Sequence, residues 1–317
     1  MDLLTTLRRA VERLAAAEIP SPQTDAELLA AHAWGISRAE LKLQVISGAA
    51  EAEAADQIQD RFWELIEERA HRVPLQHLTG VAPFRWLELQ VGPGVFVPRP
   101  ETETVVELVL QKLRALGACG VPNPRVVDLG TGSGAIAASI ATEYPAAEVH
   151  AVEVSVEAAA WAELNFRQIP NGSSPVVMHL CDLRDFSRQW HTDPANAGAL
   201  FDVVVSNPPY IPPGMIPVEP EVREHDPEIA LYGGGSDGLE LPEAVIRAAK
   251  HLLVPGGWLI LEHAEAHAEA LAGLCRADPM LENVETHRDL TDRQRSTSAT
   301  VKRGCPAGDQ RTSESAA

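Results

Sequence analysis

The sequence predicts an α/β protein, in which a doubly wound, Rossmann-like parallel sheet follows a small all-α domain. Beyond residue 101, short β-branched apolar runs alternate with segments of helical periodicity, as in strands joined by crossover helices. A glycine-rich segment, Gly130 to Gly134, follows the first of these runs, where a strand would pass into a helix. Residues 1–74 place their apolar side chains at helical spacing and show no strand pattern.

The first 74 residues predict four helices. We expect Thr24 or Asp25 to cap the second helix. Ser37, with Glu40 three residues later, predicts a capping box at the start of the third. The fourth is expected over residues 51–72, ahead of a proline. Such a domain either docks a substrate or serves packing; its residues do not decide, and we adopt the docking interpretation.

Composition and proline placement divide the rest of the chain. Prolines punctuate residues 75–100 around short apolar pieces such as Val95-Phe96-Val97, which indicates a β-hairpin-like linker. The predicted organisation is a helical domain over 1–74, a β-rich linker over 75–100, the sheet domain over 101–303 and a disordered tail over 304–317. In the sheet domain we expect strands over 126–129, 149–152, 176–180, 201–205 and 258–262, late strands near Val284 and over 297–301, and helices over 102–116, 135–142, 156–168, 242–253 and 266–276.

Charge and composition exclude several classes of protein. A net charge of −19 argues against broad binding of a phosphate backbone, which requires a basic surface. No apolar run reaches the roughly 18–20 residues of a membrane span, and the N-terminus lacks a signal-peptide core. The cysteines show no C-x-x-C spacing and the histidines no cluster, so we expect no metal site. We therefore expect a cytoplasmic protein without membrane or direct nucleic-acid partners.

Polar or glycine-rich segments at successive strand ends outline a ligand site. The loop over Gly130–Gly134 reads G-x-G-x-G, whereas a dinucleotide-binding loop reads G-x-G-x-x-G. Glu153 ends the second strand, where a carboxylate can accept hydrogen bonds from ribose hydroxyls. Asp182 follows the third strand and can accept one from an adenine amino group. No Lys or Arg accompanies the glycines, so we expect S-adenosylmethionine, an adenosine ligand without phosphate, with an NAD-type site as the lesser alternative.

Asn207-Pro208-Pro209-Tyr210 comes directly after the strand expected over 201–205. Two prolines stop a strand and remove two backbone donors. The Asn207 side-chain oxygen and the Pro208 carbonyl are then bare acceptors beside Tyr210, which together form a receptor for a planar NH2 group. Taken alone, the segment could equally be a plain strand end.

This receptor suits methyl transfer to an amide nitrogen, whose lone pair must point at the S–CH3 bond. Hydrogen bonds from its two N–H groups to Asn207 and to the Pro208 carbonyl would fix that nitrogen by positioning and preorganised electrostatics. Tyr210 would hold the planar group. We expect no general base, because the methylated cationic nitrogen loses its proton readily.

The tetrapeptide resembles the motif of class I methyltransferases that act on planar NH2 nitrogens. Further segments are similar to the bacterial release-factor glutamine N5-methyltransferase (HemK/PrmC) family: 74–80, 97–103, 128–137 and 206–211, with Gly238-Leu239, Asp289-Leu290, Arg293 and Arg295. The resemblance covers nearly the whole chain. It implies S-adenosylmethionine-dependent N5-methylation of the glutamine in the Gly-Gly-Gln motif of class-1 peptide chain release factors. The alternatives are a ribosomal-protein glutamine and, less favoured in so acidic a chain, a DNA adenine.

The residues that match the family define overlapping site sets. The catalytic set comprises Asn207, Pro208 and Tyr210. The cofactor-binding set comprises Asp128, Gly130, Thr131, Gly132, Ser133, Gly134, Glu153, Asp182, Leu183 and Asn207. The substrate-binding set comprises Asn207, Pro208, Pro209, Tyr210 and Arg99, although Arg99 is equally interpretable as part of a structural linker. Departures from the family pattern occur at Leu183, Asp226, Ala264 and His267.

Overall fold

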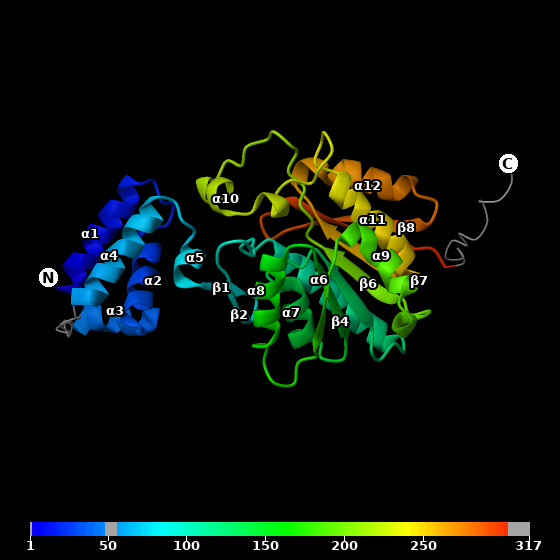
Figure 1. Cartoon of the computed structure of the whole chain (residues 1–317), viewed down its shortest axis with the longest axis horizontal. Coiled ribbons are helices and arrows are strands. Elements are labelled where there is room, and N and C mark those ends of the chain that lie inside the picture. The colour runs from blue at the N-terminus through cyan, green and yellow to red at the C-terminus, as the bar shows by residue number, and fades with distance from the viewer. Residues whose placement is uncertain (1, 48–55, 304–317) are drawn as a thin grey trace. The chain divides into compact units, whose positions relative to one another are not determined.

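The computed structural model describes residues 2–47 and 56–303, and it divides into two compact units (Figure 1). The first unit runs to Ala82 and also includes Val91–Pro93 and Ile216–Asp226. The second comprises Pro83–Gln90, Gly94–Met215 and the chain from Pro227 onward. A hairpin of β1 (Val81–Phe84) and β2 (Leu87–Gln90) lies where the two units join along the chain. Among the described residues, no helix is long and apolar enough to cross a membrane.

The first unit is helical. Its helices are α1 (Leu3–Ala16), α2 (Pro22–Trp34), α3 (Arg38–Ser47), α4 (Asp56–Ala70), α5 (Leu75–Thr79) and the remote α10 (Pro220–His225). The apolar stripes of α1 to α4 meet in one core, whose fully buried members include Leu14, Leu29, Leu41, Phe62, Leu65 and Ile66. Burial of these stripes, rather than helix propensity, supplies most of the stability of such short helices.

Local capping signals set the helix starts. The predicted capping box is confirmed, since the Ser37 backbone N–H donates to Glu40 Oε2 over 2.8 Å and the Glu40 N–H donates to Ser37 Oγ over 3.2 Å. The expectation that Thr24 or Asp25 caps the second helix is wrong. Ser21 is the N-cap, because Pro22 has its φ preset for the first helical position and starts α2 earlier. Residues 51–55 of the expected fourth helix and the expected tail over 304–317 lie outside the described residues.

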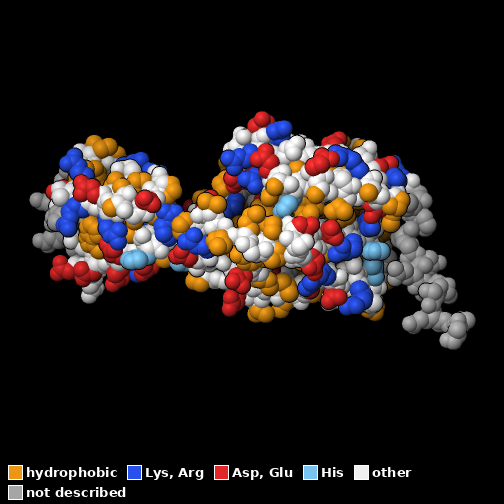
Figure 2. Space-filling model, turned by 90° about the horizontal axis from the view of Figure 1, so that it is seen from above, with side chains coloured by type: hydrophobic (Ala, Val, Ile, Leu, Met, Phe, Trp, Pro, Cys, Tyr) orange, Lys and Arg blue, Asp and Glu red, His pale blue; other side chains and the backbone are white. Residues whose placement is uncertain are grey.

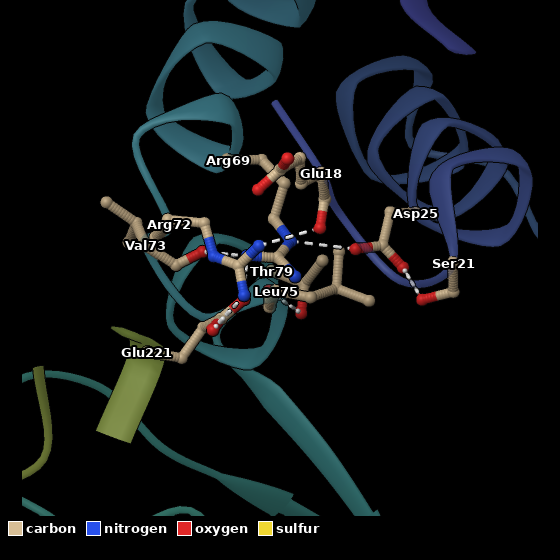
Figure 3. Close-up of polar contacts among 9 residues, drawn as sticks. All are labelled: Glu18, Ser21, Asp25, Arg69, Arg72, Val73, Leu75, Thr79 and Glu221. Carbon is tan, nitrogen blue, oxygen red and sulfur yellow. Dashed lines mark hydrogen bonds and ion pairs between the residues drawn. The ribbon is translucent and has the colours of Figure 1, made fainter. Parts of the chain in front are cut away.

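A buried ion-pair network ties α10 to the other helices of the first unit (Figure 3). Arg69 donates from Nε to Asp25 Oδ2 over 2.7 Å and from Nη1 to Glu221 Oε1 over 2.9 Å. Arg72 donates to the second oxygen of Glu221 over 2.7 Å, and Ser21 donates to Asp25 over 2.8 Å. The side chains of Arg69 and Asp25 are 7% and 4% exposed, so solvent screens this pair little.

The second unit is a seven-stranded sheet with helices on both faces (Figure 1). In spatial order its strands are β5 (Val176–Leu180), β4 (Glu148–Glu153), β3 (Arg125–Leu129), β6 (Phe201–Ser206), β7 (Leu253–Glu262), β9 (Gln294–Val301) and β8 (Leu281–Arg288). The first five are mutually parallel, while β9 is antiparallel to both β7 and β8. This confirms the predicted doubly wound α/β architecture.

Adjacent strand residues point to opposite faces of the sheet, which builds two cores. Val126, Val203 and Val205 pack in the core beneath α6 (Thr102–Ala118) and α7 (Ala135–Glu143). Val127 and Val204 pack in the other core, beneath α9, α11 and α12. Those helices are α9 (Leu183–Thr192), α11 (Glu240–Leu252) and α12 (Ala268–Ala277), and α8 (Val156–Phe166) follows β4. Because central strands are covered on both faces, they read as continuous apolar runs in the sequence.

The observed elements differ from the expected ones at identifiable places. Residues 95–97, expected as a short apolar piece of the hairpin-like linker, form no strand. Helix α9 was not expected; its apolar residues are few, and Asp182 caps it by accepting from the Arg184 N–H over 2.8 Å. Strand β7 begins at Leu253 rather than at 258, because Leu253 pairs with Phe201 ahead of a register shift.

Candidate active site

Five parallel strands bring their carboxyl ends to one edge of the sheet. The glycine loop follows β3, Glu153 ends β4, Asp182 follows β5, Asn207 follows β6 and Glu262 ends β7. In open α/β sheets, ligands bind at this edge, where the order of strands reverses. Here the reversal falls between β3 and β6, which places the glycine loop beside the Asn-Pro-Pro-Tyr segment.

The glycine loop turns the chain from β3 into α7. Gly130, Gly132 and Gly134 have φ values of 77°, 57° and 83°, a region that residues with a Cβ rarely adopt. A Cβ on Gly134 would lie 2.6 Å from the Phe166 ring, whereas Cβ atoms on Gly130 and Gly132 would meet nothing within 4 Å. Gly134 thus permits close helix packing, while the other two present open backbone of the kind a ligand can approach.

Hydrogen bonds of Asp128, Thr131 and Ser133 hold the glycine loop in place. Thr131 Oγ1 donates to Asp128 Oδ2 over 2.6 Å, and both side chains are buried. Burial raises the pKa of Asp128 to about 7. The Ser133 carbonyl accepts from the Asn165 side-chain amide over 2.9 Å, which ties the loop to α8. Asp128, Thr131 and Ser133 therefore hold the shape of the loop.

Glu153 links the loop to the end of β4. Its Oε2 accepts from the Gly132 N–H over 2.8 Å, and its Oε1 accepts from the N–H groups of Val154 and Ser155, each over 2.9 Å. A carboxylate offers about four acceptor positions, so about one remains for a ribose hydroxyl. The expected pairing of Glu153 with both ribose hydroxyls would require it to exchange one backbone partner.

Asp182 and Leu183 lie at the next strand end. Asp182 makes a two-point ion pair with Arg184, with the shortest contact 2.5 Å from Nη2 to Oδ2. This guanidinium lowers the pKa of Asp182 below its usual range. Leu183 is buried. An adenine amino group would therefore share Asp182 with Arg184, a partner that the sequence interpretation did not include.

Asn207 is half-buried, and the NH2 group of its side chain is held by a hydrogen bond. Its Nδ2 donates to Thr102 Oγ1 over 3.2 Å, and Thr102, the first residue of α6, is itself buried. In the described part of the chain, no backbone N–H donates to the Pro208 carbonyl. The Nδ2 contact turns the Asn207 side-chain oxygen away from Thr102, and that this oxygen and the Pro208 carbonyl accept from a substrate stays a prediction.

The far half of the motif is fixed by the segment after it. The Ile211 N–H donates to the Leu231 carbonyl over 2.8 Å, and the Gly233 N–H donates back to the Ile211 carbonyl over 3.1 Å. A Cβ on Gly238 would lie 2.4 Å from the Tyr210 carbonyl, so only glycine allows the two segments to approach this closely. The backbone at Tyr210 and Ile211 is therefore packed against Leu231, Gly233 and Gly238.

Tyr210 and Arg99 share one environment. Burial raises the pKa of Tyr210 to about 12; the Glu262 carboxylate adds to the rise, whereas Arg295 and Arg99 oppose it. Tyr210 therefore stays neutral across the physiological range. Arg99 also lies over the Phe96 ring, 5.0 Å from its centroid. Arg99 thus lies within electrostatic range of Tyr210, and its role in substrate binding stays a prediction.

Two residues beside Asn207, Thr102 and Glu262, were not among the predicted site residues. Glu262 ends β7, is 3% exposed and accepts hydrogen bonds from Thr102 and Asn207. An acidic residue closing a strand otherwise made of apolar side chains was the signal that could have identified it. In the described ranges, no group of three or more His, Cys, Asp or Glu residues could hold a metal ion.

The sheet order, the glycine loop and the carboxylate at the end of β4 define a class I S-adenosylmethionine-dependent methyltransferase. Residues 5–80 match the family model of the PrmC N-terminal domain, and residues 121–310 match that of a methyltransferase domain. The release factor glutamine methyltransferase of Streptomyces coelicolor is 43% identical over 96% of this chain and 99% of its own length. That of Bifidobacterium longum is 40% identical, covering 93% of this chain and 98% of its own. The chain belongs to the release factor glutamine methyltransferase family.

Another relative of this chain has a different named activity. The 4-amino-L-phenylalanine/4-methylamino-L-phenylalanine methyltransferase of Streptomyces pristinaespiralis is 38% identical over 80% of this chain and 80% of its own length. Its named acceptor carries an amino group on an aromatic ring. Similarity to these relatives therefore does not by itself choose between an amide and an arylamine acceptor.

Proposed function

We propose that this enzyme methylates N5 of the glutamine in the Gly-Gly-Gln motif of class-1 peptide chain release factors, in the cytoplasm. The observation that carries the proposal is the arrangement of Asn207: its Nδ2 donates to Thr102, which leaves its oxygen for a substrate N–H next to the Pro208 carbonyl. The names of the two relatives that match nearly the whole chain support the amide as acceptor.

The residues of the site would position and polarise the substrate amide. S-adenosylmethionine supplies an electrophilic methyl group when bound. Asn207 Oδ1 and the Pro208 carbonyl would accept the two N–H groups, fixing the nitrogen and favouring the positive charge that develops on it. Tyr210 would hold the planar group as a neutral phenol, since its pKa is raised to about 12. Gly130, Gly132 and Glu153 would hold the adenosine side of the cofactor.

The chain after the motif offers a surface for a protein substrate. Met215, Ile216 and Val218 are 57%, 68% and 93% exposed and follow Tyr210 within a few residues along the chain. Clustered exposed apolar side chains are typical of protein contact sites. On the face shown in Figure 2, basic and acidic side chains are interspersed rather than gathered into a basic surface. These features favour a protein acceptor over nucleic acid.

A methyl-transfer assay with labelled S-adenosylmethionine tests the proposal. The acceptors are a purified class-1 release factor, its Gln→Ala variant in the Gly-Gly-Gln motif, ribosomal protein, duplex DNA and 4-amino-L-phenylalanine. Label on the wild-type release factor, and on no other acceptor, is the expected result. Label on DNA, ribosomal protein or the free amino acid, with none on the release factor, would overturn the substrate assignment.

A further inference from the structure

Glu262 ends β7, the strand that pairs with β6, and the Asn-Pro-Pro-Tyr motif follows β6. In the register between β6 and β7, Ser206 is opposite Leu261, so the next residues of the two strands are Asn207 and Glu262. On its other side, Glu262 pairs with Ser296 of β9. The side chain is 3% exposed, and within the described chain its Oε2 has no hydrogen-bond partner. A carboxylate this deeply buried with one oxygen unpaired is costly to the fold.

The hydrogen bonds around Glu262 have only one consistent direction when it is ionised. A carboxylate only accepts, so the Thr102 hydroxyl must give its single proton to Glu262. Thr102 Oγ1 can then only accept from Asn207, which it does over 3.2 Å. The Asn207 amide also donates to Glu262. Both partners therefore require the NH2 end of Asn207, and its oxygen must face away from them.

We propose that Glu262 is a positioning residue, whose ionised carboxylate, together with Thr102, orients the Asn207 carboxamide so that its oxygen accepts from the substrate NH2. The proposal rests on the proposed function for its substrate, but the orientation of Asn207 is a property of the enzyme itself. The opposite orientation would put the Asn207 oxygen against the carboxylate, where two acceptors repel each other. Glu262 acts through Asn207, and this role requires no contact with substrate.

Protonation of Glu262 removes this constraint. Burial raises the pKa of Glu262 to about 7; Arg295 opposes the rise and Glu101 adds to it. The other ionisable groups nearby are Tyr210, Arg99, His263 and His267. A protonated carboxyl group carries a donor, which can pair with the Asn207 oxygen and hold it away from the substrate. We therefore expect turnover to fall as the pH drops through about 7.

The kinetic test compares Glu262→Gln with Glu265→Gln, an exposed acidic control three residues along the same segment. E262Q should lower kcat by about ten- to a hundredfold, the effect of losing one hydrogen bond to a charged group, and should abolish the loss of activity below about pH 7. Affinity for S-adenosylmethionine should stay unchanged. E265Q should behave as wild type. A wild-type kcat and pH profile in E262Q would overturn the proposal.

Thr102 supplies a second pair of variants that keeps the test valid if E262Q fails to fold. Thr102→Val removes the hydroxyl at constant shape, and Thr102→Ser restores it. Thr102→Val should lower kcat with unchanged cofactor affinity, and Thr102→Ser should recover most of it. Equal activity in the two variants would contradict the relay from Glu262 through Thr102 to Asn207.

A spectroscopic test needs no methyl acceptor and so separates this proposal from the proposed function. In protein labelled with ¹⁵N-asparagine, the Asn207 side-chain signals, assigned by their loss in Asn207→Ala, are followed between about pH 6 and about pH 8.5. They should shift with a midpoint near 7 in wild type and E265Q, and stay constant in E262Q. Wild-type signals that do not shift would refute the orientation. A shift in an enzyme that leaves release factors unlabelled would refute only the substrate.

Discussion

Glu153 serves both the fold and the expected cofactor site. Three backbone N–H groups, from Gly132, Val154 and Ser155, occupy most of its acceptor positions. The carboxylate therefore fixes the position of the glycine loop relative to the end of β4. A ligand would meet a loop that is already shaped, so that little conformational entropy is lost on binding.

Replacing Glu153 should weaken cofactor binding by two routes, loss of a ribose acceptor and loosening of the loop. We expect Glu153→Ala to reduce the affinity for S-adenosylmethionine by about 1.5–3 kcal/mol, the range for a hydrogen bond to a charged group. Isothermal titration calorimetry measures it. Glu148→Gln, at the opposite end of the same strand, is the control and should bind normally. Equal affinities for the two variants would refute the assignment.

Asn207 is the residue on which the proposed methyl transfer would depend most directly. Asn207→Ala removes one of the two acceptors for the substrate NH2 group and should lower kcat by about 100- to 1000-fold, as loss of a preorganised polar group does elsewhere. Cofactor affinity should fall much less. The measurement is single-turnover methyl transfer alongside calorimetry. Turnover at the wild-type rate would show that the motif is only the end of a strand.

The buried His179 should make the folded protein less stable in acid. Burial lowers the pKa of His179 to about 4, and its Nε2 lies 2.9 Å from Nδ1 of His150. A histidine in the unfolded chain has a pKa of about 6.5. Between about pH 6.5 and about pH 4, His179 therefore binds a proton in the unfolded chain but not in the folded protein. Stability should therefore fall as the pH drops through this window. Thermal melts of His179→Leu should show a smaller fall, and identical slopes would contradict the assignment.

Among the elements, the chain from Tyr210 to Asp226 has two contrasting parts. Ile211 is held by backbone hydrogen bonds to Leu231 and Gly233. After Ile211 come Met215, Ile216 and Val218, all exposed. An immobile motif followed by exposed apolar side chains can hold the reacting atoms still while the next residues bind a partner.

The exposed apolar residues should affect substrate binding rather than chemistry. A triple change of Met215, Ile216 and Val218 to Ser should raise KM for the release factor with little change in kcat or in melting temperature, because exposed side chains add little to stability. Steady-state kinetics with intact release factor measures this. Leu274→Ser, which alters a 39% exposed leucine on α12, is the control. An unaltered KM would exclude this segment from docking.

At the scale of the whole molecule, the helical unit includes a segment that lies between two strands of the sheet, β6 and β7, in the sequence. Ile216–Asp226 belongs to the same compact unit as α1 to α5. Arg69 is the centre of this assembly, since it pairs with Asp25 and with Glu221, a residue 152 positions later (Figure 3). The chain directly after the catalytic motif is thereby anchored in the helical unit.

Removing Arg69 should destabilise this unit strongly. Arg69→Leu leaves Asp25 buried without its cation, which costs about 3–5 kcal/mol, while the partly buried Glu221 keeps Arg72. Arg13→Leu breaks the exposed pair with Glu67 and should cost less than about 1 kcal/mol. Urea denaturation compares the two free energies of unfolding. Adding Asp25→Leu should recover much of the loss, and similar costs for both single variants would contradict a buried network.

The amino-acid sequence was enough to predict the architecture and the family, both of which are confirmed, and to define a candidate site. Fully covered strands must be apolar on both faces, so the runs at 126–129 and 201–205 were visible without coordinates. The glycine loop and Asn-Pro-Pro-Tyr were visible for a similar reason, because backbone conformation and missing donors are written in residue type. The sequence pattern did not predict helix α9, because a short amphipathic segment gives only a weak periodic signal.

Which residues meet across long stretches of chain became visible only in the folded protein. Thr102, Asn207 and Glu262 come from α6, the end of β6 and the end of β7, and Arg184 takes part of the Asp182 carboxylate. Arg69 and Glu221 are likewise joined only by folding. Sequence patterns report the local conformation and burial of each segment. The direction of a hydrogen bond and the pairing of buried charges depend on neighbours that only the assembled sheet and helices supply.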